Sequence, residues 1–344
     1  MTASARVDEF EALRPHLLAV AYRLTGTFAD AEDIVQDAWL RWDRDERLRE
    51  EPASPDERLR EEPSVPRRGE IADLRAWLTT VVSRLSLDRL RSAAHRREAY
   101  VGEWLPEPVV TGLDGDDPLS VVVAGEDARF AAMVVLERLN PAQRVAFVLR
   151  EGFGVPFAEI ADVLGVSVPA ARQLASRARR VVGGPDEPLA RRESSPDEPP
   201  RRGHDEVVGA LLAALAAGDV DAVVALLHGD VTLVGDSNGK TRTAIREIRG
   251  PDRVARFLFG LARRYGPGWL ESSRAALVNG ELGAYSVGTD GGDGFDAAHP
   301  RVVAVSVRDG KVGAVWDIAN PDKFTGSPLR ASSRPTGSGR HPRS

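Results

Sequence analysis

The chain has 344 residues, with 46 basic against 52 acidic side chains and no cysteine. Its length suggests two or three domains, and the lack of cysteine excludes disulfides, thiolate zinc sites and thiol catalysis. The acidic N-terminal region and the absence of any run of eighteen apolar residues predict a soluble protein of the reducing cytoplasm with no membrane partner.

Charge is segregated along the chain, although the net charge is only −6. The segment 67–97 carries eight arginines against three acids, whereas acids gather in 30–37 and in the proline-rich stretches. The local charge, rather than the total, decides whether a surface attracts a polyanion. A nucleic-acid partner is therefore compatible with this composition.

Two helices are expected near the N-terminus. In 10–24, apolar side chains recur at helical spacing up to Thr25-Gly26. A second helix is expected to be capped by Asp30, and its outward face is acidic and amide-rich, which taken alone is most simply a solvated surface. Residues 45–66 then hold the octapeptide DERLREEP twice, and this stretch is expected to be a mobile surface insertion because its composition cannot bury a core.

The helical pattern resumes over 71–97. Arginines, hydroxyl groups and Trp77 occur together there, a combination that suits a nucleic-acid backbone and unstacked bases. Trp77 is equally compatible with a place in the core. The segment 100–111, YVGEWLPEPVVT, is bounded by proline and cannot continue a helix, and 114–117 is acidic linker.

A helix-turn-helix is the clearest pattern in the chain. Helices expected at 126–138 and 141–150, the latter capped by Asn140, precede a helix over 157–164 that Gly165 ends. Ser167 is expected to cap a second helix, which continues to Val182. The expected buried face of that helix consists of Val168, Ala171, Leu174, Ala175 and Ala178. Its opposite face is cationic and suited to the major groove, and the alternative is an ordinary helical hairpin with a solvated basic face.

After a linker at 183–203, helices alternate with strands and the pattern indicates an α+β domain with a curved sheet around a cavity. A four-strand meander is expected at its end, with a hairpin turn at Asp309-Gly310. The expected helices are 207–217, 220–228 and 252–265, and the expected strands are 231–234, 241–248, 269–278, 283–287, 302–308 and 312–318.

The order of these segments resembles a known family. DAEDIVQDAWLRW, RAWLTTVVSRLSLDRLRSA and LERLNPAQRVAFVLREGFGVPFAEIADVLGVSVPAARQLASRARR look like the two characteristic domains of extracytoplasmic-function sigma factors of the sigma-70 family, over about residues 8–182. YVGEWLPEP, the run 236–240 and the run 320–324 are similar to the SigJ-type subgroup, which carries a fused SnoaL-like C-terminal domain of the nuclear transport factor 2 fold.

The resemblance implies two all-α sigma domains, the second with the helix-turn-helix, followed by an α+β SnoaL-like cone domain. The implied boundaries are 8–98 for sigma domain 2, 99–125 for a linker, 126–182 for sigma domain 4, 183–203 for a second linker, 204–326 for the SnoaL-like domain and 327–344 for a disordered tail. Core RNA polymerase and promoter DNA are the implied partners, with no separate anti-sigma factor required and no cofactor or metal.

The resemblance also assigns roles to residues of this chain. The residues implied to bind polymerase are Asp33, Gln36, Asp37 and Leu40. Those implied to open and read the −10 element are Trp77, Arg84, Asp88, Arg89 and Arg91. Those implied to contact the −35 major groove are Ala170, Arg172, Gln173, Ser176, Arg177 and Arg180. Those implied to make regulatory contacts in cis are Tyr100, Trp104, Pro106, Asp236, Lys240, Asn320, Pro321, Asp322 and Lys323.

Other functions remain open for the C-terminal domain. SnoaL-like domains include cyclases and isomerases that use an acid or base in the cone, for which the candidates are His228, Asp230, Asp236 and Asp317, although their spacing forms no recognisable constellation. A small unknown ligand in the cavity is a further possibility. For the whole chain, the alternatives are a DNA-binding repressor, or a small-molecule-binding or cyclase-like enzyme fused to a DNA-binding module.

Overall fold

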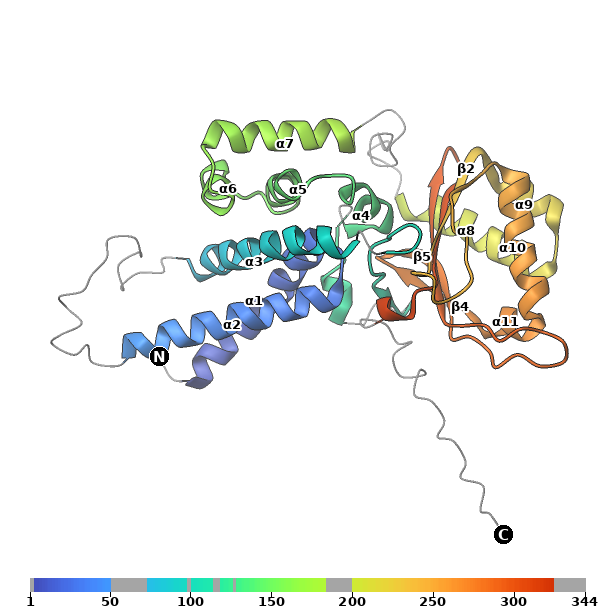
Figure 1. The fold of residues 1–344 in the computed structure, drawn as a ribbon, viewed down its shortest axis with the longest axis horizontal. Helices are drawn as coiled ribbons and strands as arrows, with labels where there is room; N and C mark the ends of the chain where they lie inside the picture. Colours follow the sequence, from blue (N-terminus) through green and yellow to red (C-terminus); the bar gives the residue numbers. More distant parts are fainter. Residues whose placement is uncertain are drawn as a thin grey trace, which may run out of the picture. The chain divides into compact units, whose positions relative to one another are not determined.

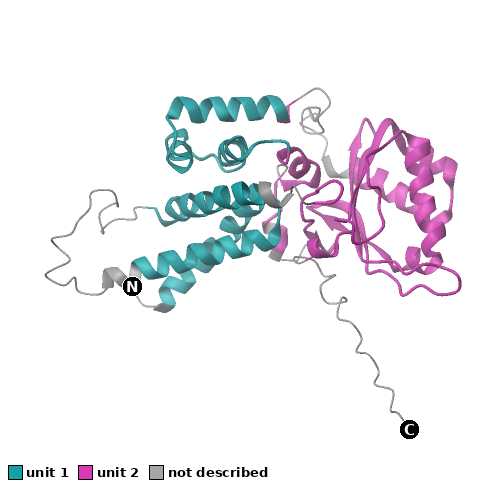
Figure 2. Cartoon of the chain, viewed as in Figure 1, with its two compact units in different colours: residues 1–95, 138–181 teal, residues 96–137, 182–344 magenta. Residues whose placement is uncertain are grey.

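The computed structural model describes residues 3–50, 73–97, 100–113, 118–125, 128–183 and 200–324. The chain forms two compact units (Figure 2): unit 1 comprises residues 1–95 and 138–181, and unit 2 comprises 96–137 and 182–344. The chain thus leaves the first unit, returns to it and leaves it again. Four expected segments lie wholly or mostly outside the described residues: the duplicated insertion, the acidic run 114–117, the linker 183–203 and the tail 327–344.

Unit 1 is helical, as expected. Phe10 packs against Trp39 and Trp42 with ring centroids 5.0 and 6.1 Å apart, and Trp42 is buried. The second helix begins at Phe28 rather than after Asp30, so Asp30 lies in its first turn, where a carboxylate favours the helix dipole. The helices are α1 (Ala3–Thr25), α2 (Phe28–Glu50), α3 (Leu74–Arg97), α5 (Pro141–Phe147), α6 (Phe157–Leu164) and α7 (Val168–Val182), with a π-helical turn η4 (Val148–Gly152) (Figure 1).

Asn140 caps α5 as expected. Its side chain accepts a hydrogen bond from the Gln143 amide at 2.9 Å, and the Gln143 side chain accepts from the Asn140 amide at 3.2 Å. This reciprocal pair satisfies two N–H groups at the start of the helix. The helix was expected to run to residue 150, but the chain widens into η4 after Phe147.

Unit 2 contains one mixed sheet, ordered β1-β4-β5-β6-β7-β2-β3, in which β2 and β7 are parallel and the other pairs antiparallel. The expected meander is present as β4 to β7, and Asp309 and Gly310 form its last turn with φ of 53° and 68°. The strands are β1 (Val110–Thr111), β2 (Leu227–Asp236), β3 (Ile248–Arg249), β4 (Ser273–Val278), β5 (Glu281–Ser286), β6 (Arg301–Arg308) and β7 (Lys311–Ile318). The helices are α4 (Phe130–Leu136), α8 (Pro200–Ala217), α9 (Val220–Leu226), α10 (Pro251–Tyr265) and α11 (Pro267–Ser272), with short 3-10 turns η2 (Pro118–Val121) and η5 (Pro321–Lys323).

Both faces of this sheet are covered. Along β6, Val303, Val305 and Val307 pack in a core with α8, α9 and α10, whereas Val302 and Ala304 point into a second core. That second core also holds Leu105, Val110, Phe130 and Ala131. The expected linker 99–125 and α4 therefore fill the sheet face opposite α8 to α10, and the boundary of the second unit differs from the expected one.

One expected strand is wrong, and another begins four residues later than expected. The segment 241–248 forms a loop, of which only Ile248 joins the sheet in β3. This loop passes close beside β2: a Cβ on Gly235 would lie 2.2 Å from Thr243 Oγ1 and 2.6 Å from the Ala244 carbonyl oxygen. Residues 269–272 belong to helix α11, because Gly266 at φ 77° turns the chain and Pro267 opens a helix.

Candidate nucleic-acid and polymerase surfaces and the linker anchor

The helix-turn-helix is present with the expected caps. Gly165 ends α6 in the left-handed region at φ 65°, and the Val166 amide bonds to the Ala161 carbonyl at 3.0 Å. The Ser167 hydroxyl accepts from the Ala170 amide at 3.4 Å. Of the expected buried face, Ala171, Ala175 and Ala178 are buried, whereas Val168 and Leu174 are half-buried.

The opposite face of α7 is exposed to solvent. Arg172, Gln173, Ser176, Arg177 and Arg180 are exposed, and Ala170 is half-buried. The Arg179 guanidinium, on the same helix, donates to the Glu151 carboxylate at 2.5 Å. The remaining arginines and the amide of Gln173 offer the fork-shaped donors that read base edges in the major groove.

The predicted −10 residues all lie on α3, and two of them form ion pairs with residues of other helices. Arg84 donates to Asp162 of α6 at 2.7 Å. Arg89 lies 3.2 Å from Asp33 and 3.4 Å from Asp30, both in α2. Arg89 thus pairs with a predicted polymerase-binding residue, and neither Asp162 nor Asp30 as a partner was foreseen.

The other predicted residues of α3 lie near its surface. Asp88 and Arg91 are exposed and form an ion pair one turn apart, at 3.6 Å. Trp77 is half-buried, which fits both of its sequence interpretations. These side chains offer cations, a carboxylate and one aromatic surface along a single helix.

The predicted polymerase residues share the exposed face of α2. Asp33, Gln36 and Asp37 are exposed, and Leu40 is 56% exposed at the end of this face. A single exposed leucine is ordinary on a protein surface, so Leu40 does not by itself mark a binding site.

Within unit 1, the 138–181 segment packs against α1. The buried guanidinium of Arg144 donates to the Leu24 carbonyl at 3.1 Å. Phe153 lies 5.4 Å from the His16 ring and 4.9 Å from the Arg23 guanidinium. Burial, together with the positive charges of Arg75 and Arg23, lowers the pKa of His16 to about 4, so this imidazole is neutral at physiological pH.

A buried carboxylate anchors the segment after α3 to the sheet of unit 2. Asp236, at the end of β2, is 1% exposed and accepts from the Leu105 amide at 2.7 Å and from Lys323 Nζ at 2.6 Å. It also accepts from the Tyr100 hydroxyl, and Lys323 donates to the Leu105 carbonyl. Lys323 Nζ lies 3.9 Å from the centre of the Trp104 ring. We call this group the linker anchor.

The remaining regulatory candidates surround the anchor. Asn320 donates to the Tyr100 hydroxyl at 2.8 Å, Pro106 is buried, Pro321 is exposed, and Lys240 forms an exposed ion pair with Asp322. Burial and the hydrogen bond to Asp236 raise the pKa of Tyr100 far above its ordinary value. Its hydroxyl therefore remains a donor to the carboxylate at any physiological pH.

Asn279 is a structural position that the sequence did not reveal. It is fully buried in the turn after β4, accepts from the Val109 amide at 3.1 Å and donates to the Ala128 carbonyl at 2.8 Å. One side chain thus holds both ends of the segment that precedes α4. The dipeptide Asn279-Gly280 between two apolar runs was a signal of a tight turn, but not of these distant contacts.

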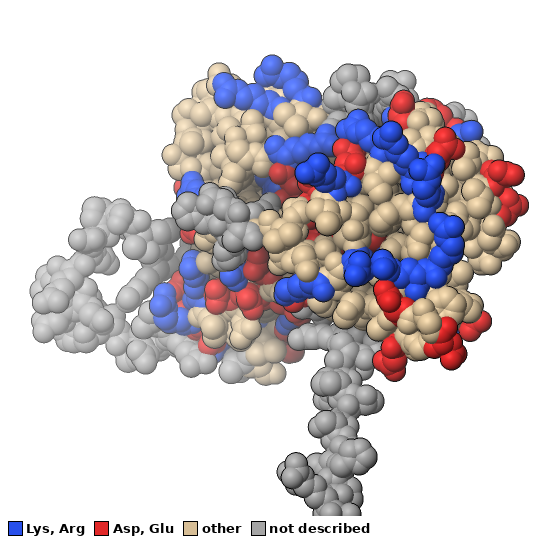
Figure 3. All heavy atoms as spheres, turned by 45° about the vertical axis from the view of Figure 1, so that its right-hand side comes forward, with Lys and Arg blue, Asp and Glu red and all other residues tan. Residues whose placement is uncertain are grey.

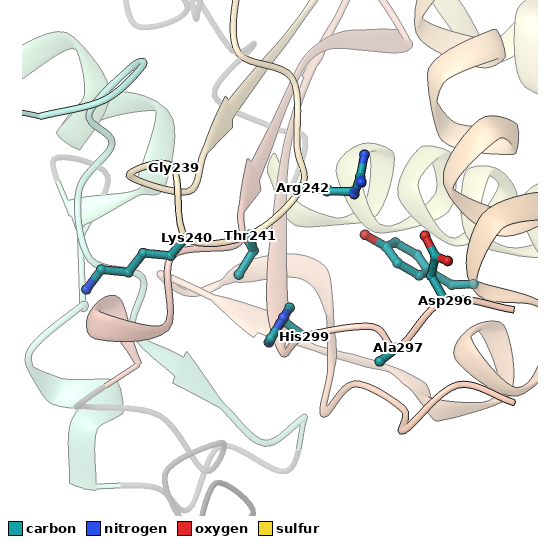
Figure 4. Close-up of a pocket in the computed structure, with 8 residues that line it drawn as sticks. Gly239, Lys240, Thr241, Arg242, Asp296, Ala297 and His299 are labelled. Atoms are coloured by element: carbon teal, nitrogen blue, oxygen red, sulfur yellow. The ribbon is translucent and has the colours of Figure 1, made fainter.

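The four candidate acids and bases form no catalytic group. His228 accepts from Arg308 at 2.8 Å, and Asp230 is exposed. Asp236 is occupied by the anchor, and Asp317 forms a buried ion pair with Arg301 at 3.0 Å. Unit 2 also has a polar cavity of about 260 Å³ (Figure 4). It is lined by Gly239, Lys240, Thr241, Arg242, Tyr265, Asp296, Ala297 and His299, and by none of the four candidates.

The described ranges contain no cluster of three or more histidine and acidic side chains placed to hold a metal ion. No helix among the described residues has the length and apolarity needed to cross a bilayer.

Comparison with known proteins agrees with this architecture. Residues 10–56 match the family "Sigma-70 region 2" and residues 129–181 match "Sigma-70, region 4". The chain is 63% identical to the ECF RNA polymerase sigma factor SigJ of Mycobacterium tuberculosis, over 98% of this chain and 99% of the relative. It is 30% identical to a probable ECF RNA polymerase sigma factor, SigI, of the same species, over 94% of this chain and 95% of the relative.

The crystal structure of Mycobacterium tuberculosis SigJ superposes with a TM-score of 0.75 at 61% identity, covering 94% of this chain and 99% of that one. The expected family and fold class are confirmed. The chain belongs to the extracytoplasmic-function sigma factors of the sigma-70 family, which are transcription initiation factors and not enzymes.

Proposed function

We propose that α2 binds core RNA polymerase, that α3 and α7 contact the −10 and −35 elements of promoter DNA, and that unit 2 regulates these contacts in cis. On this proposal the chain acts in the cytoplasm. The observation that carries the regulatory part is the linker anchor, because it fastens the segment that joins the two sigma regions to the C-terminal sheet.

The DNA part of the proposal rests on α7 and α3. An exposed face with Arg172, Gln173 and Arg177 on the second helix of a helix-turn-helix has the donors and the shape for major-groove readout. Strand opening needs groups that hold unstacked bases, a task suited to the half-buried Trp77 with the arginines beside it.

The regulatory part needs no second protein. Residues 105–111 are buried, and Val110 and Phe130 lie in one core with Trp316 and Ile318. A change in the C-terminal sheet therefore reaches the segment that follows α3 and leads to α5. A tethered domain acts at an effective concentration near mM, so even weak contacts suffice and no separate anti-sigma factor is required.

Run-off transcription with purified core polymerase tests the initiation role. We expect transcripts from a cognate promoter with core enzyme and this chain alone, and their loss in the Arg172→Ala/Arg177→Ala variant. A repressor or an enzyme with a DNA-binding appendage would give no promoter-dependent transcript.

The regulatory role is tested by point variants. Removal of the chain after residue 202 would strip the sheet from Leu105, Val110 and Phe130, so a change in activity could reflect exposed apolar surface alone. Tyr100→Phe instead removes one hydroxyl from the linker anchor, and Tyr285→Phe removes one from unit 2 outside the anchor. We expect the first to change run-off yield at least about twofold and the second to leave it unchanged. Equal yields from both would rule out regulation through this anchor.

A second candidate function is the binding of a small polar ligand in the cavity of unit 2. Its lining carries the donors Arg242 and His299, and Asp296 is already neutralised by Arg264 at 2.8 Å (Figure 4). The chemistry fits a small carboxylate or phosphate. Citrate and inorganic phosphate should raise the melting temperature of the wild type but not of His299→Ala, and no shift in the wild type would overturn this candidate.

A further inference from the structure

Unit 2 carries a strongly basic surface that the sigma-factor surfaces above do not include. Residues 242–264 contain seven arginines and two acids, Glu247 and Asp252, in a chain whose net charge is −6. All seven arginines are exposed, and we call them the arginine face: Arg242, Arg246, Arg249, Arg253, Arg256, Arg263 and Arg264. Figure 3 shows basic side chains gathered in a curved band on the side of the molecule that carries α10.

Four of these arginines form a stripe along α10. Their spacing places Arg253, Arg256, Arg263 and Arg264 within about 100° of one another around the helix axis. Val254, Ala255, Leu261 and Tyr265 are buried against the sheet on the other side of the helix. Arg249 of β3 lies two residues before the start of α10, and Arg242 lines the cavity beside Tyr265, the last residue of α10. The positive charge therefore runs the full length of the helix.

Most of this charge is not neutralised within the protein. Arg249 pairs with Glu247 at 2.9 Å and Arg264 with Asp296 at 2.8 Å. In the part of the chain that the structure describes, no carboxylate lies within 4.0 Å of the guanidinium groups of Arg246, Arg253, Arg256 or Arg263.

Helix stability does not explain the stripe. Arg263 and Arg264 in the last turn favour the helix dipole, but Arg253 lies in the first turn, where a cation opposes it. A stripe that only kept the domain soluble would be expected to mix both charges, since unpaired like charges repel. The dipole thus accounts for Arg263 and Arg264, and for Asp252 in the first turn, but not for Arg253 and Arg256, which an anionic partner would explain.

We infer that the arginine face is a further DNA-binding surface, which contacts the phosphate backbone of duplex DNA next to the promoter elements. This inference rests on one part of the proposed function, namely that the chain binds promoter DNA. A helix of 15 residues is about 22 Å long and can follow the backbone over roughly six base pairs. Because guanidinium groups bind phosphates and α10 enters no groove as part of a recognition motif, the contact adds affinity without sequence preference.

The test compares two charge-matched variants of the full chain. Arg256→Gln/Arg263→Gln removes two unpaired arginines from the stripe, and glutamine is a good helix former, so α10 is retained. Arg274→Gln/Lys311→Gln removes the same charge from exposed positions of β4 and β7 outside the arginine face. Binding to a fluorescent duplex of about 40 bp with random sequence is measured by anisotropy from roughly 50 to 200 mM salt.

We expect the stripe variant to bind about tenfold more weakly at the lowest salt, with a salt dependence reduced by about 1.8 in slope, or 0.9 for each lost phosphate contact. The control variant should match the wild type. If the two variants bind alike, the inference is wrong. It is also wrong if the stripe variant keeps its DNA affinity and instead loses binding to phosphatidylserine vesicles. Run-off transcription by the wild type tests the proposed function independently, so a failure of either can be told from a failure of the other.

Discussion

Arg84 of α3 donates to the carboxylate of Asp162 in α6 at 2.7 Å, so a predicted −10 contact is held by the first helix of the helix-turn-helix. Both side chains belong to unit 1. The two surfaces expected to meet different promoter elements are therefore tied to each other in the free protein. On the proposed function, contact of Arg84 with DNA replaces its ion pair with Asp162.

Asp162→Asn should release Arg84 at little cost in stability. The partners are 49% and 68% exposed, and such pairs contribute about 0–1 kcal/mol, so the melting temperature should change by no more than about 2–4 °C. Affinity for promoter DNA should rise by up to about fivefold, since each factor of ten corresponds to about 1.4 kcal/mol. The control is Glu159→Gln, which removes the same charge from α6 without touching Arg84. An equal rise in DNA affinity in both variants would mean that the change in net charge, and not the release of Arg84, causes the effect.

Asp236→Ala should release the segment after α3 from the sheet of unit 2. Asp236→Ala leaves Lys323 Nζ and the Leu105 amide buried without their shared acceptor, and breaking a buried ion pair costs about 3–5 kcal/mol. The bond between Trp104 and Leu105, where Leu105 is 3% exposed, should then become a cleavage site for chymotrypsin, detected by mass spectrometry. Lys240→Ala breaks only the exposed pair with Asp322 and should leave this bond protected. Protection of the bond in Asp236→Ala would show that the anchor does not hold this segment.

The second buried ion pair of unit 2 tests whether an apolar pair can stabilise the domain as well as two opposite charges do. Arg301 and Asp317 are each 2% exposed, and Arg301 lies 5.5 and 5.4 Å from the rings of Tyr265 and Trp269. Asp317→Ala should lower the melting temperature by roughly 10 °C, because the guanidinium stays buried and uncompensated. Arg301→Met/Asp317→Leu should recover most of the loss, since an apolar pair of similar volume replaces both charges. A double variant as unstable as the single one would contradict this account.

His16 should make unit 1 sensitive to acid. Its pKa in the folded protein is about 4, against 6.5 for an ordinary histidine, so between these values the unfolded chain binds a proton that the folded chain does not. Stability should therefore fall as the pH drops from about 6.5 to about 4, and be unaffected by this group above that range. In His16→Gln this fall should be smaller, as measured by thermal unfolding at several pH values. His299→Gln, in unit 2, is the control and should retain the wild-type dependence.

The elements that the sequence predicted well are those with a local signal. The face of α7 follows from apolar side chains at helical spacing, and the caps at Asn140, Ser167 and Gly165 follow from residue types that form hydrogen bonds within a few positions. The turn at Asp309-Gly310 is of the same kind. Each of these features is decided by neighbours in the sequence.

The features that the sequence did not reveal depend on distant partners. YVGEWLPEPVVT was correctly expected not to be helical, but its burial results from Asp236, Asn279 and Lys323, each more than a hundred residues away. The segment 241–248 has strand-forming residues but crosses β2 at close range where Gly235 has no side chain. The ion pair that occupies Arg84 could not be seen, because nothing local connects it to Asp162.

The packing of Phe130 against Trp316, with ring centroids 5.6 Å apart, has a consequence for synthesis on the ribosome. Leu105, Val110 and Phe130 emerge well before β4 to β7, the strands that cover them. At 5–20 residues per second, these side chains stay uncovered for roughly 10 to 40 s, and α5 to α7 of the first unit are made during the same interval. During translation, this internal segment is the part of the nascent polypeptide that a holdase chaperone would engage.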